Sequence, residues 1–408
     1  MRRTNANINI MDAEQKEDDP NANFSESELS NWIQDKKFDY AISFLNSNDR
    51  FVTPDNKAAA VSYKDVQNKT SLMVAVKVGA PFSLVKKLCD IGDNKLLISK
   101  QDDEGWTALH YACCHRDEPN IDTLQLLVKN GGGQDLVLKQ NKSGKTALHY
   151  ACDRDSPSIA MLRLLVKNVG GQDIVHKQDK DGRTALHVAC SRDSPSMDML
   201  RFLVENGGGQ EIVLKQDKDG WTALRYACSR ESPSIDMLRF LVIHGGGQAM
   251  ILNQNKDGET ALHYACNRDE PSIDMLQFLV ESGGGQDLVL KQDKDGRTAL
   301  HYACSRDEPS IDTLLLLLEY GGQEIVIKED NDGWTALHYA CSRDEPSIVM
   351  LRFLVENGGG QYIVLKQDKD GRTALHVACS RHEPNIAMLW LLVKNGGQAI
   401  ILKHNKDG

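Results

Sequence analysis

Residues 298–304 read Thr-Ala-Leu-His-Tyr-Ala-Cys, and this peptide or a near copy of it occurs eight times in the chain of 408 residues. The copies begin at Thr107, Thr146, Thr184, Thr222, Thr260, Thr298, Thr335 and Thr373. Successive threonines are 37 to 39 residues apart. A fixed period of this length is typical of one supersecondary unit that is stacked many times. The sequence therefore predicts an array of like repeats, and not the separate globular domains that chain length alone would suggest.

The copy at residues 178–215 contains two helix signals. The hydroxyl of Thr184 is predicted to cap a short apolar helix. Pro195 has no N–H to donate, so it separates this helix from a second one that begins near Ser196. Apolar residues lie on two faces of the second helix, as expected for a helix packed between neighbouring repeats. Gly207 is predicted to end it in the left-handed conformation, and an apolar triplet in the connector favours one more helical turn.

Four segments are expected along the chain. Residues 1–26 are rich in Asn, Asp and Glu and poor in large apolar residues, which predicts a disordered acidic tail. Residues 27–69 are predicted to form N-terminal capping helices, and residues 70–403 the array of one divergent and eight close copies. Residues 404–408 begin a further, incomplete repeat. We therefore expect that the chain is a fragment or a truncated product, or that its end docks on another molecule.

The net charge is modest for a chain of this length. The 48 basic and 58 acidic residues give −10, of which the three bases and seven acids of residues 1–30 supply −4. The remaining −6 amounts to less than one charge per repeat, which argues against a strongly basic nucleic-acid surface. No apolar run approaches the roughly 18 residues of a membrane span, and no apolar stretch follows Arg2 and Arg3 as a secretory signal would require. We expect an intracellular protein, in the cytoplasm or the nucleus, that binds neither membrane nor nucleic acid.

Eight of the ten cysteines share one repeat position, immediately after an alanine of the first helix. They are Cys113, Cys152, Cys190, Cys228, Cys266, Cys304, Cys341 and Cys379. Packed helices lie roughly 8–10 Å apart, whereas a disulfide requires Cα atoms within about 7 Å. These cysteines are therefore expected to be small buried residues in a reducing compartment.

Thr-x-Leu-His-x-Ala, followed by a second helix, a glycine and an Asp-x-x-Gly turn, resembles the ankyrin repeat. The resemblance covers about residues 70–403. The period is 38 where the family has about 33, with two extra residues before Pro195 and three between Gly207 and Asp217. Alanine replaces the usual proline of the motif, and Arg225 replaces its histidine in one copy, where local hydrogen bonding should differ.

The resemblance implies an all-α solenoid in which the turns project as fingers beside the concave face of the first helices. Ankyrin arrays mostly bind other proteins through these fingers and this face, and they carry no chemistry of their own. The resemblance also gives the motif histidine a structural role beside the capping threonine.

Three patterns could suggest bound ions or phosphate, and each has a structural explanation. His187 and Cys190 could face one way, but a closed zinc site needs four ligands and the next pair lies about 10 Å away. Residues 253–258 imitate half of an EF-hand loop, whose twelfth position is Tyr264 and not glutamate. The glycine runs lack the lysine of a phosphate loop. We expect no catalytic residue, no cofactor and no metal site.

A recurring arginine follows each first helix and lies beside an acidic residue in all copies but the last. These are Arg116, Arg154, Arg192, Arg230, Arg268, Arg306, Arg343 and Arg381. Stacking could align them into an arginine–carboxylate ladder between repeats. Exposed pairs contribute about 0–1 kcal/mol each, so such a ladder would tune the stacking without driving it.

The copies differ most at the residue just after the turn glycine. We take these residues as candidate partner-binding positions: Trp106, Lys145, Arg183, Trp221, Glu259, Arg297, Trp334 and Arg372. Tryptophan recurs at every third copy, and aromatic anchors are enriched at interface hot spots. Alternatively, each tryptophan packs on the neighbouring finger, or a duplicated block of three repeats carried it along.

The leading functional hypothesis is a non-catalytic, monomeric scaffold that binds one or more proteins on the finger-lined face. A second hypothesis is the interaction arm of a longer enzyme or adaptor whose catalytic part is absent. A third is a structural or assembly element whose uniform surface stacks repetitively.

Overall fold

The structure, a computed structural model, describes residues 26–47, 53–91, 94–114, 120–154, 158–168, 171–192, 195–230, 233–306 and 310–406. The predicted disordered tail, residues 1–26, lies outside these ranges except for its last residue. The described residues form helices joined by turns and contain no strand. The chain consists of two compact units, residues 1–180 and residues 181–408.

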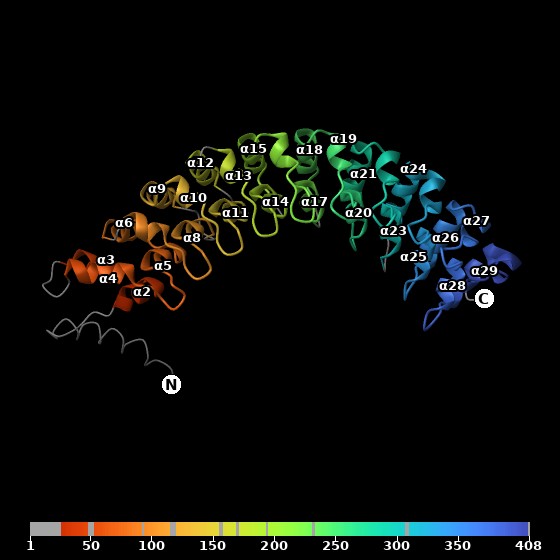
Figure 1. Cartoon of the computed structure of the whole chain (residues 1–408), viewed down its shortest axis with the longest axis horizontal. Coiled ribbons are helices and arrows are strands. Elements are labelled where there is room, and N and C mark those ends of the chain that lie inside the picture. The colour runs from red at the N-terminus through yellow and green to blue at the C-terminus, as the bar shows by residue number, and fades with distance from the viewer. Residues whose placement is uncertain are drawn as a thin grey trace. The chain divides into compact units, whose positions relative to one another are not determined.

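The first unit begins with helices in the segment predicted to cap the array. Its helices are α2 Glu26–Gln34, α3 Phe38–Asn46, α4 Pro54–Ser62, α5 Ser71–Lys77, α6 Phe82–Ile91, α7 Asn94–Ser99, α8 Ala108–Cys114, α9 Ile121–Asn130, α10 Gln134–Val137, α11 Ala147–Cys152, α12 Ile159–Lys167 and α13 Gln172–Val175 (Figure 1). Leu29 and Ile33 of α2 are fully buried, and Trp32 contacts Phe44 of α3 edge to face at 5.9 Å between ring centroids. These apolar contacts hold α2 and α3 together at the start of the stack.

The second unit repeats one pattern of a first helix, a second helix and a short connector helix. Its helices are α14 Ala185–Cys190, α15 Met197–Asn206, α16 Gln210–Val213, α17 Ala223–Cys228, α18 Ile235–His244, α19 Gln248–Ile251, α20 Ala261–Cys266, α21 Ile273–Ser282, α22 Gln286–Val289, α23 Ala299–Cys304, α24 Ile311–Ile327, α25 Ala336–Cys341, α26 Ile348–Asn357, α27 Gln361–Val364, α28 Ala374–Cys379 and α29 Ile386–Ile401 (Figure 1).

The helix boundaries follow the predicted caps. Thr184 is the N-cap of α14, and its hydroxyl accepts the backbone N–H of His187. Ser196 caps α15 by accepting the N–H of Met199. The predicted extra helical turn is present as α16. The apolar side chains of α14 are buried, as are Ile212 and Val213 of α16. In α15, Met199, Leu200, Leu203 and Val204 are buried, whereas Met197 and Phe202 are half-buried. The buried residues of neighbouring elements form a continuous core within the unit.

The glycine run after α15 corrects one sequence expectation. Gly207, predicted to be left-handed, has φ −100°. Gly208 and Gly209 instead have φ 77° and 62°. Glycine is required at position 207 for a different reason: a Cβ there would lie 2.7 Å from the side chain of Ile212. The chain therefore turns back one residue later than expected, and Ile212 packs against the bare backbone of Gly207.

Within each unit, first helices pack against first helices and second helices against second helices. In the first unit α5, α8 and α11 form one layer, and α6, α9 and α12 form the other. In the second unit α17, α20 and α23 belong to one layer, and α21, α24 and α26 to the other. The turns lie beside the layer of first helices, opposite the second helices (Figure 1).

The two departures from the 38-residue spacing have local causes. The copy that begins at Thr298 is one residue shorter because it has two glycines where most copies have three, so α24 continues across a kink at Gly322. The copy that begins at Thr107 is one residue longer, and its first helix extends to Cys114. The extra residue leaves the Cys114 side chain exposed, while Cys113 keeps the buried repeat position.

Candidate functional site

Each turn of the eight close copies is built around one aspartate or asparagine, which is buried in every copy except at Asp330, where it is half-buried. Oδ1 of Asp217 accepts the backbone N–H groups of Asp219 and Trp221, both at 2.9 Å. Oδ2 of Asp217 accepts the hydroxyl of Tyr226, on α17, at 2.7 Å. One carboxylate thus closes the turn and ties it to the first helix of its own repeat. The same tyrosine bond recurs from Tyr111 to Asp102, Tyr302 to Asp293 and Tyr339 to Asp330.

Neighbouring turns are joined by a backbone hydrogen bond. The N–H of Lys218 donates to the carbonyl of Asp181 at 2.9 Å, and equivalent bonds run from Lys256 to Asp219 and from Lys294 to Asp257. The turns approach so closely that a Cβ on Gly182, where φ is 80°, would lie 2.5 Å from the nitrogen of Lys218. The turn tips of the second unit are therefore held in a continuous row.

The motif histidine joins its repeat to the next at His110, His187, His263, His301 and His338. His301 accepts the backbone N–H of Thr298 at Nδ1 (3.0 Å) and donates from Nε2 to the carbonyl of Trp334 (3.2 Å). This arrangement requires the neutral ring with its proton on Nε2. Burial lowers the pKa of His301 to about 4, and burial likewise lowers the pKa of His110 to about 4. His301 and His110 are thus structural groups, as the family resemblance implies, and both are neutral at physiological pH.

We use the name turn face for the surface made by the residue after each turn glycine together with the tyrosines of the first helices. It comprises Trp106, Lys145, Arg183, Trp221, Glu259, Arg297, Trp334 and Arg372 with Tyr111, Tyr150, Tyr226, Tyr264, Tyr302 and Tyr339. All but Tyr302, which is buried, are partly exposed. The structure thus gathers the eight candidate residues, within each unit, beside aromatic side chains that the sequence analysis did not single out.

In the first unit, Trp106 is packed between two tyrosines. Its ring centroid lies 4.9 Å from that of Tyr111, in its own repeat, and 4.4 Å from that of Tyr150, in the next repeat. The ammonium group of Lys145 lies 5.5 Å from the Tyr150 ring, within the range of a cation–π contact. Trp106 therefore packs on the neighbouring repeat and is also accessible at the surface.

The other two tryptophans also contact the following repeat. Nε1 of Trp334 donates to Oδ2 of Asp368 at 3.0 Å. Trp221 meets Tyr264 edge to face, with 6.0 Å between ring centroids. Each tryptophan side chain is consequently held in place by the repeat that follows it. Packing and partner binding are compatible for these residues, because a partly exposed ring can do both.

The charged turn-face residues are mostly paired. Nε of Arg297 donates to Asp293 at 2.9 Å, and its Nη2 lies 2.7 Å from Asp295. Burial alone would raise the pKa of Asp293, but hydrogen bonds from Tyr302 and Arg297 hold it below its usual value. The remaining pairs are Arg183 with Asp181, Arg372 with Asp368 and Asp370, and Glu259 with Tyr302 and Asn255.

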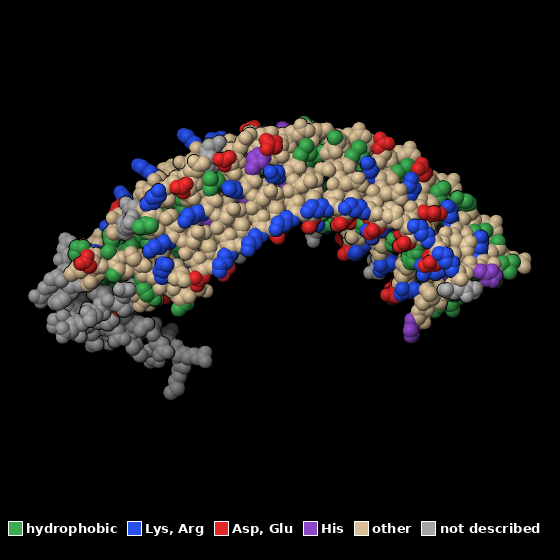
Figure 2. All heavy atoms as spheres, in the orientation of Figure 1, with side chains coloured by type: hydrophobic (Ala, Val, Ile, Leu, Met, Phe, Trp, Pro, Cys, Tyr) green, Lys and Arg blue, Asp and Glu red, His purple; other side chains and the backbone are tan. Residues whose placement is uncertain are grey.

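The turn tips carry both signs of charge. Lys218 and Asp219 are exposed in one tip, and Lys294 and Asp295 are exposed in another. Figure 2 shows Lys and Arg side chains beside Asp and Glu side chains along the edge that the turns form in each unit. This mixed pattern is unlike the single-sign stripe of a protein that binds a nucleic-acid backbone.

The recurring arginines connect successive repeats in the second unit. Nη1 of Arg381 donates to the carbonyl of Ser342, in the preceding repeat, at 2.7 Å. Arg381 and Arg306 also pair with Asp344 and Asp269 of their preceding repeats. The arginine–carboxylate ladder expected from the sequence is present at these positions, and backbone carbonyls supply part of it.

The cysteines lack the features of reactive thiols. In the described residues every cysteine is free, and the repeat cysteines are buried except Cys379 in the last copy. Burial raises the pKa of Cys228 and of Cys266 to about 12, so both thiols stay protonated at neutral pH. In the described part of the chain, no three His, Cys, Asp or Glu side chains are grouped as metal ligands would be.

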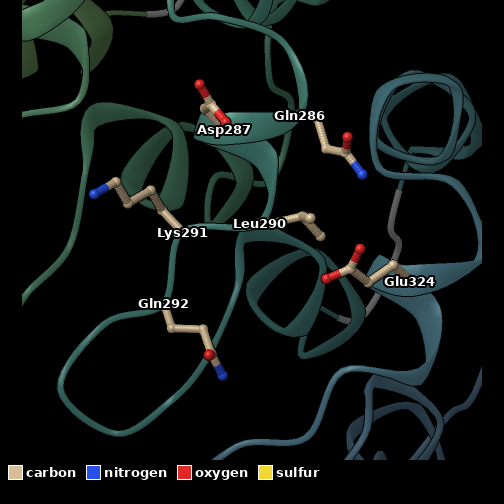
Figure 3. A pocket seen from close by; sticks show the side chains of 6 residues that line it. All are labelled: Gln286, Asp287, Leu290, Lys291, Gln292 and Glu324. Carbon is tan, nitrogen blue, oxygen red and sulfur yellow. The ribbon is translucent and has the colours of Figure 1, made fainter.

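An open surface depression of about 450 Å³ lies at the connector segments, and one of its lining residues, Gln292, donates to the carbonyl of Gly296 in the turn. It is lined by Gln286, Asp287, Leu290, Lys291, Gln292 and Glu324 (Figure 3). Gln286 and Glu324 lie on facing elements with Leu290 between them, and Lys291 is directed away (Figure 3). The lining contains no nucleophile paired with a base. In the described residues, no helix is both long enough and apolar enough to cross a bilayer.

Comparison with known proteins identifies the class of this chain. A family model described as ankyrin repeats in three copies matches residues 72–178, 160–251, 232–329 and 316–403. The chain therefore belongs to the ankyrin-repeat family. Ankyrin repeats are generally protein–protein interaction modules and are typically non-catalytic. A comparison with curated protein sequences finds no match.

Solved structures of ankyrin repeat proteins are similar to parts of the chain. The ankyrin repeat protein EF0377 is 20% identical and covers 54% of this chain and 97% of its own, with a TM-score of 0.42. The ankyrin repeat domain of Bcl-3, a member of the IkappaB protein family, is 28% identical and covers 61% of this chain and 99% of its own, with a TM-score of 0.47.

Proposed function

We propose that this chain is a non-catalytic scaffold that binds a protein partner on the turn face, the concave face that the family resemblance implies. The observation that carries the proposal is the contrast between two parts of each repeat. The recurring peptide is used for capping and core packing, whereas the residue just after the turn glycine varies from copy to copy and is partly exposed. Residues that vary on a rigid scaffold usually determine which partner a protein binds.

The composition of the turn face supports this proposal. Tryptophan, tyrosine and arginine are the residues enriched at interface hot spots. Trp106, Trp221 and Trp334 are each held by a contact with the following repeat, so little side-chain entropy would be lost when a partner binds. The aromatic rings are therefore preorganised to contact a partner.

The chemistry of the repeat peptide supports a role without catalysis. The motif histidines that hydrogen-bond on both ring nitrogens are committed to the backbone, and the buried thiols are protonated. We infer that the chain acts as a monomer without cofactor or metal, with one or more proteins as its partners. The free cysteines suit a reducing compartment such as the cytoplasm or the nucleus.

Replacing Trp106, Trp221 and Trp334 together with alanine tests the proposal. We expect partner recovery in a pull-down with the full chain, quantified by mass spectrometry, to fall at least tenfold, because single hot-spot residues contribute about 2 kcal/mol or more. Stability should also fall, by about 0.5–1.5 kcal/mol for each lost aromatic contact, so partner recovery is compared at a temperature where the variant is still folded. Thermal unfolding followed by circular dichroism would measure this loss.

Trp390→Ala is the matched control. Trp390 is 62% exposed and lies on α29, a second helix outside the turn face. Its replacement should leave partner recovery unchanged. Equal recovery with the wild type and the triple variant would show that the tryptophans only pack between repeats.

A further inference from the structure

Arg225 is the departure from the repeat peptide that changes the turn face. Every other close copy has histidine at this position. In the equivalent copies the histidine completes a capping box with the threonine, but α17 has no capping box and no side-chain cap hydrogen bond at Thr222. The bond from Nε2 to the next repeat, made by His263 to the carbonyl of Arg297, has no counterpart here.

A small void lies beside Arg225. Its volume is about 10 Å³, and Thr222, Leu224 and Asn255 are among the residues that line it. Such a space holds at most one water molecule. The junction between this copy and the next lacks the capping box and the histidine hydrogen bond, so we expect arginine at this position to lower the stability of the array.

The Arg225 side chain lies beside the turn face among three aromatic rings. Its guanidinium carbon is 4.0 Å from the ring centroid of Tyr264, 5.1 Å from that of Tyr226 and 5.5 Å from that of Trp221. Contacts at these distances are within the range of cation–π attraction. They place the guanidinium carbon over the Tyr264 ring, between Tyr226 and Trp221.

Arg225 lies beside the turn face and differs from the turn-face arginines because its charge is not paired. Arg183, Arg297 and Arg372 each bond to a carboxylate of their own turn. Among the described residues, Arg225 has neither an ion pair nor a hydrogen bond, and its Nε is buried without a partner. Two carboxylates of the turns on either side are already engaged: Asp217 accepts Tyr226, and Glu259 accepts Tyr302 and Asn255.

We propose that Arg225, Trp221, Tyr226 and Tyr264 form a carboxylate-binding site, which receives a glutamate or aspartate side chain of the partner protein. The guanidinium fork matches a carboxylate, and the rings exclude water around the pair. One unpaired cation balances a single negative charge. A phosphate group would bring nearly two charges next to the exposed Asp219 and Asp257, so a carboxylate is favoured. This inference rests on the proposed function and names the partner chemistry at one point of the turn face.

The test uses the full chain, its Arg225→His and Arg225→Gln variants, and fluorescein-labelled peptides that alternate glycine with glutamate, glutamine or phosphoserine. Fluorescence anisotropy at low salt measures binding. The wild type should bind the glutamate peptide at least tenfold more tightly than the glutamine peptide. Both variants should lose that difference. Arg239→Gln, on the second helix of the same copy, removes the same charge outside the turn face and should bind like the wild type.

Thermal unfolding separates binding from folding. Arg225→His restores the capping box and the bond to the next repeat, so its unfolding midpoint should rise by about 2–4 °C. Arg225→Gln restores neither the capping box nor the bond to the next repeat, so its unfolding midpoint should not rise. A more stable Arg225→His variant with weakened glutamate-peptide binding supports the site.

Three results with the peptides would overturn the carboxylate site: equal binding of the glutamate and glutamine peptides by the wild type, unchanged binding by Arg225→His, or tighter binding of the phosphoserine peptide. If the captured partner requires the three tryptophans but not Arg225, the scaffold proposal stands and the carboxylate site is wrong.

Discussion

Acidification from pH 7 to pH 4.5 is expected to destabilise the array by several kcal/mol, because the repeats are joined through neutral histidines. Burial lowers the pKa of His110 and of His301 to about 4, and it lowers the pKa of His263 and of His338 as well. The unfolded chain, with histidine pKa values near about 6.5, binds more protons over this range. The contribution of these histidines to the free energy of unfolding is therefore fully present above about pH 6.5, and it is lost progressively as the pH falls towards about 4.

The size of the effect follows from the same shift. One histidine with a pKa of about 4 in the folded state and about 6.5 in the unfolded state lowers the free energy of unfolding by on the order of 2 kcal/mol when the pH falls from 7 to 4.5. Lowered carboxylate pKa values, such as that of Asp293, act in the same direction at still lower pH. Urea unfolding followed by circular dichroism between pH 7.5 and pH 4.5 measures the loss.

His301→Gln is the informative variant for this prediction. It should be less stable than the wild type at pH 7, because the bonds to Thr298 and Trp334 are weakened, and its stability should depend less on pH. The histidine account fails if the wild type unfolds at the same urea concentration at pH 7 and pH 4.5.

Gly182→Ala is expected to cost about 3 kcal/mol, the largest effect of a single methyl group in the second unit. Two penalties combine at this position. The φ of 80° costs a residue with a side chain about 1 kcal/mol. The added Cβ would also lie 2.5 Å from the backbone nitrogen of Lys218, which donates to Asp181. Because the obstacle is backbone, the two turns must move apart.

Gly209→Ala separates these two penalties. Gly209 has φ 62°, but a Cβ there would meet no atom within 4 Å. The substitution should therefore show the conformational penalty alone, about 1 kcal/mol. Equal losses in the two variants, measured by urea unfolding, would contradict the close approach of neighbouring turns.

The repeated local chemistry made most of the fold predictable from the sequence. Thr184 and Pro195, like the residues at the same positions of the other copies, mark helix boundaries through interactions within a few residues. The constant period places the copies in a stack. The burial of Cys190 and of its equivalents other than Cys379 follows from the same reasoning. Cys379, predicted to be buried like the others, is exposed in the last copy. Gly207 was assigned the wrong conformation, because the sequence does not show which residue of a glycine run turns the chain back.

The turn face was predicted only in part, because its contacts join residues that are distant in the sequence. The bond from Tyr226 to Asp217 spans nine residues, and the contact of Trp221 with Tyr264 crosses to the next repeat. The tyrosine that recurs after the motif histidine was an available signal for this face. Arg225 was noted as a departure, but its position among three rings required the structure.

The most direct test of the central claim, that the turn face binds the partner, is hydrogen–deuterium exchange of the full chain alone and with a captured partner. Exchange of the turns and first helices, including residues 216–228 and 254–266, should slow when the partner is bound. Exchange of the second helices α18 and α21 should stay the same. Protection confined to the second helices, with no change in the turns, would contradict the proposal.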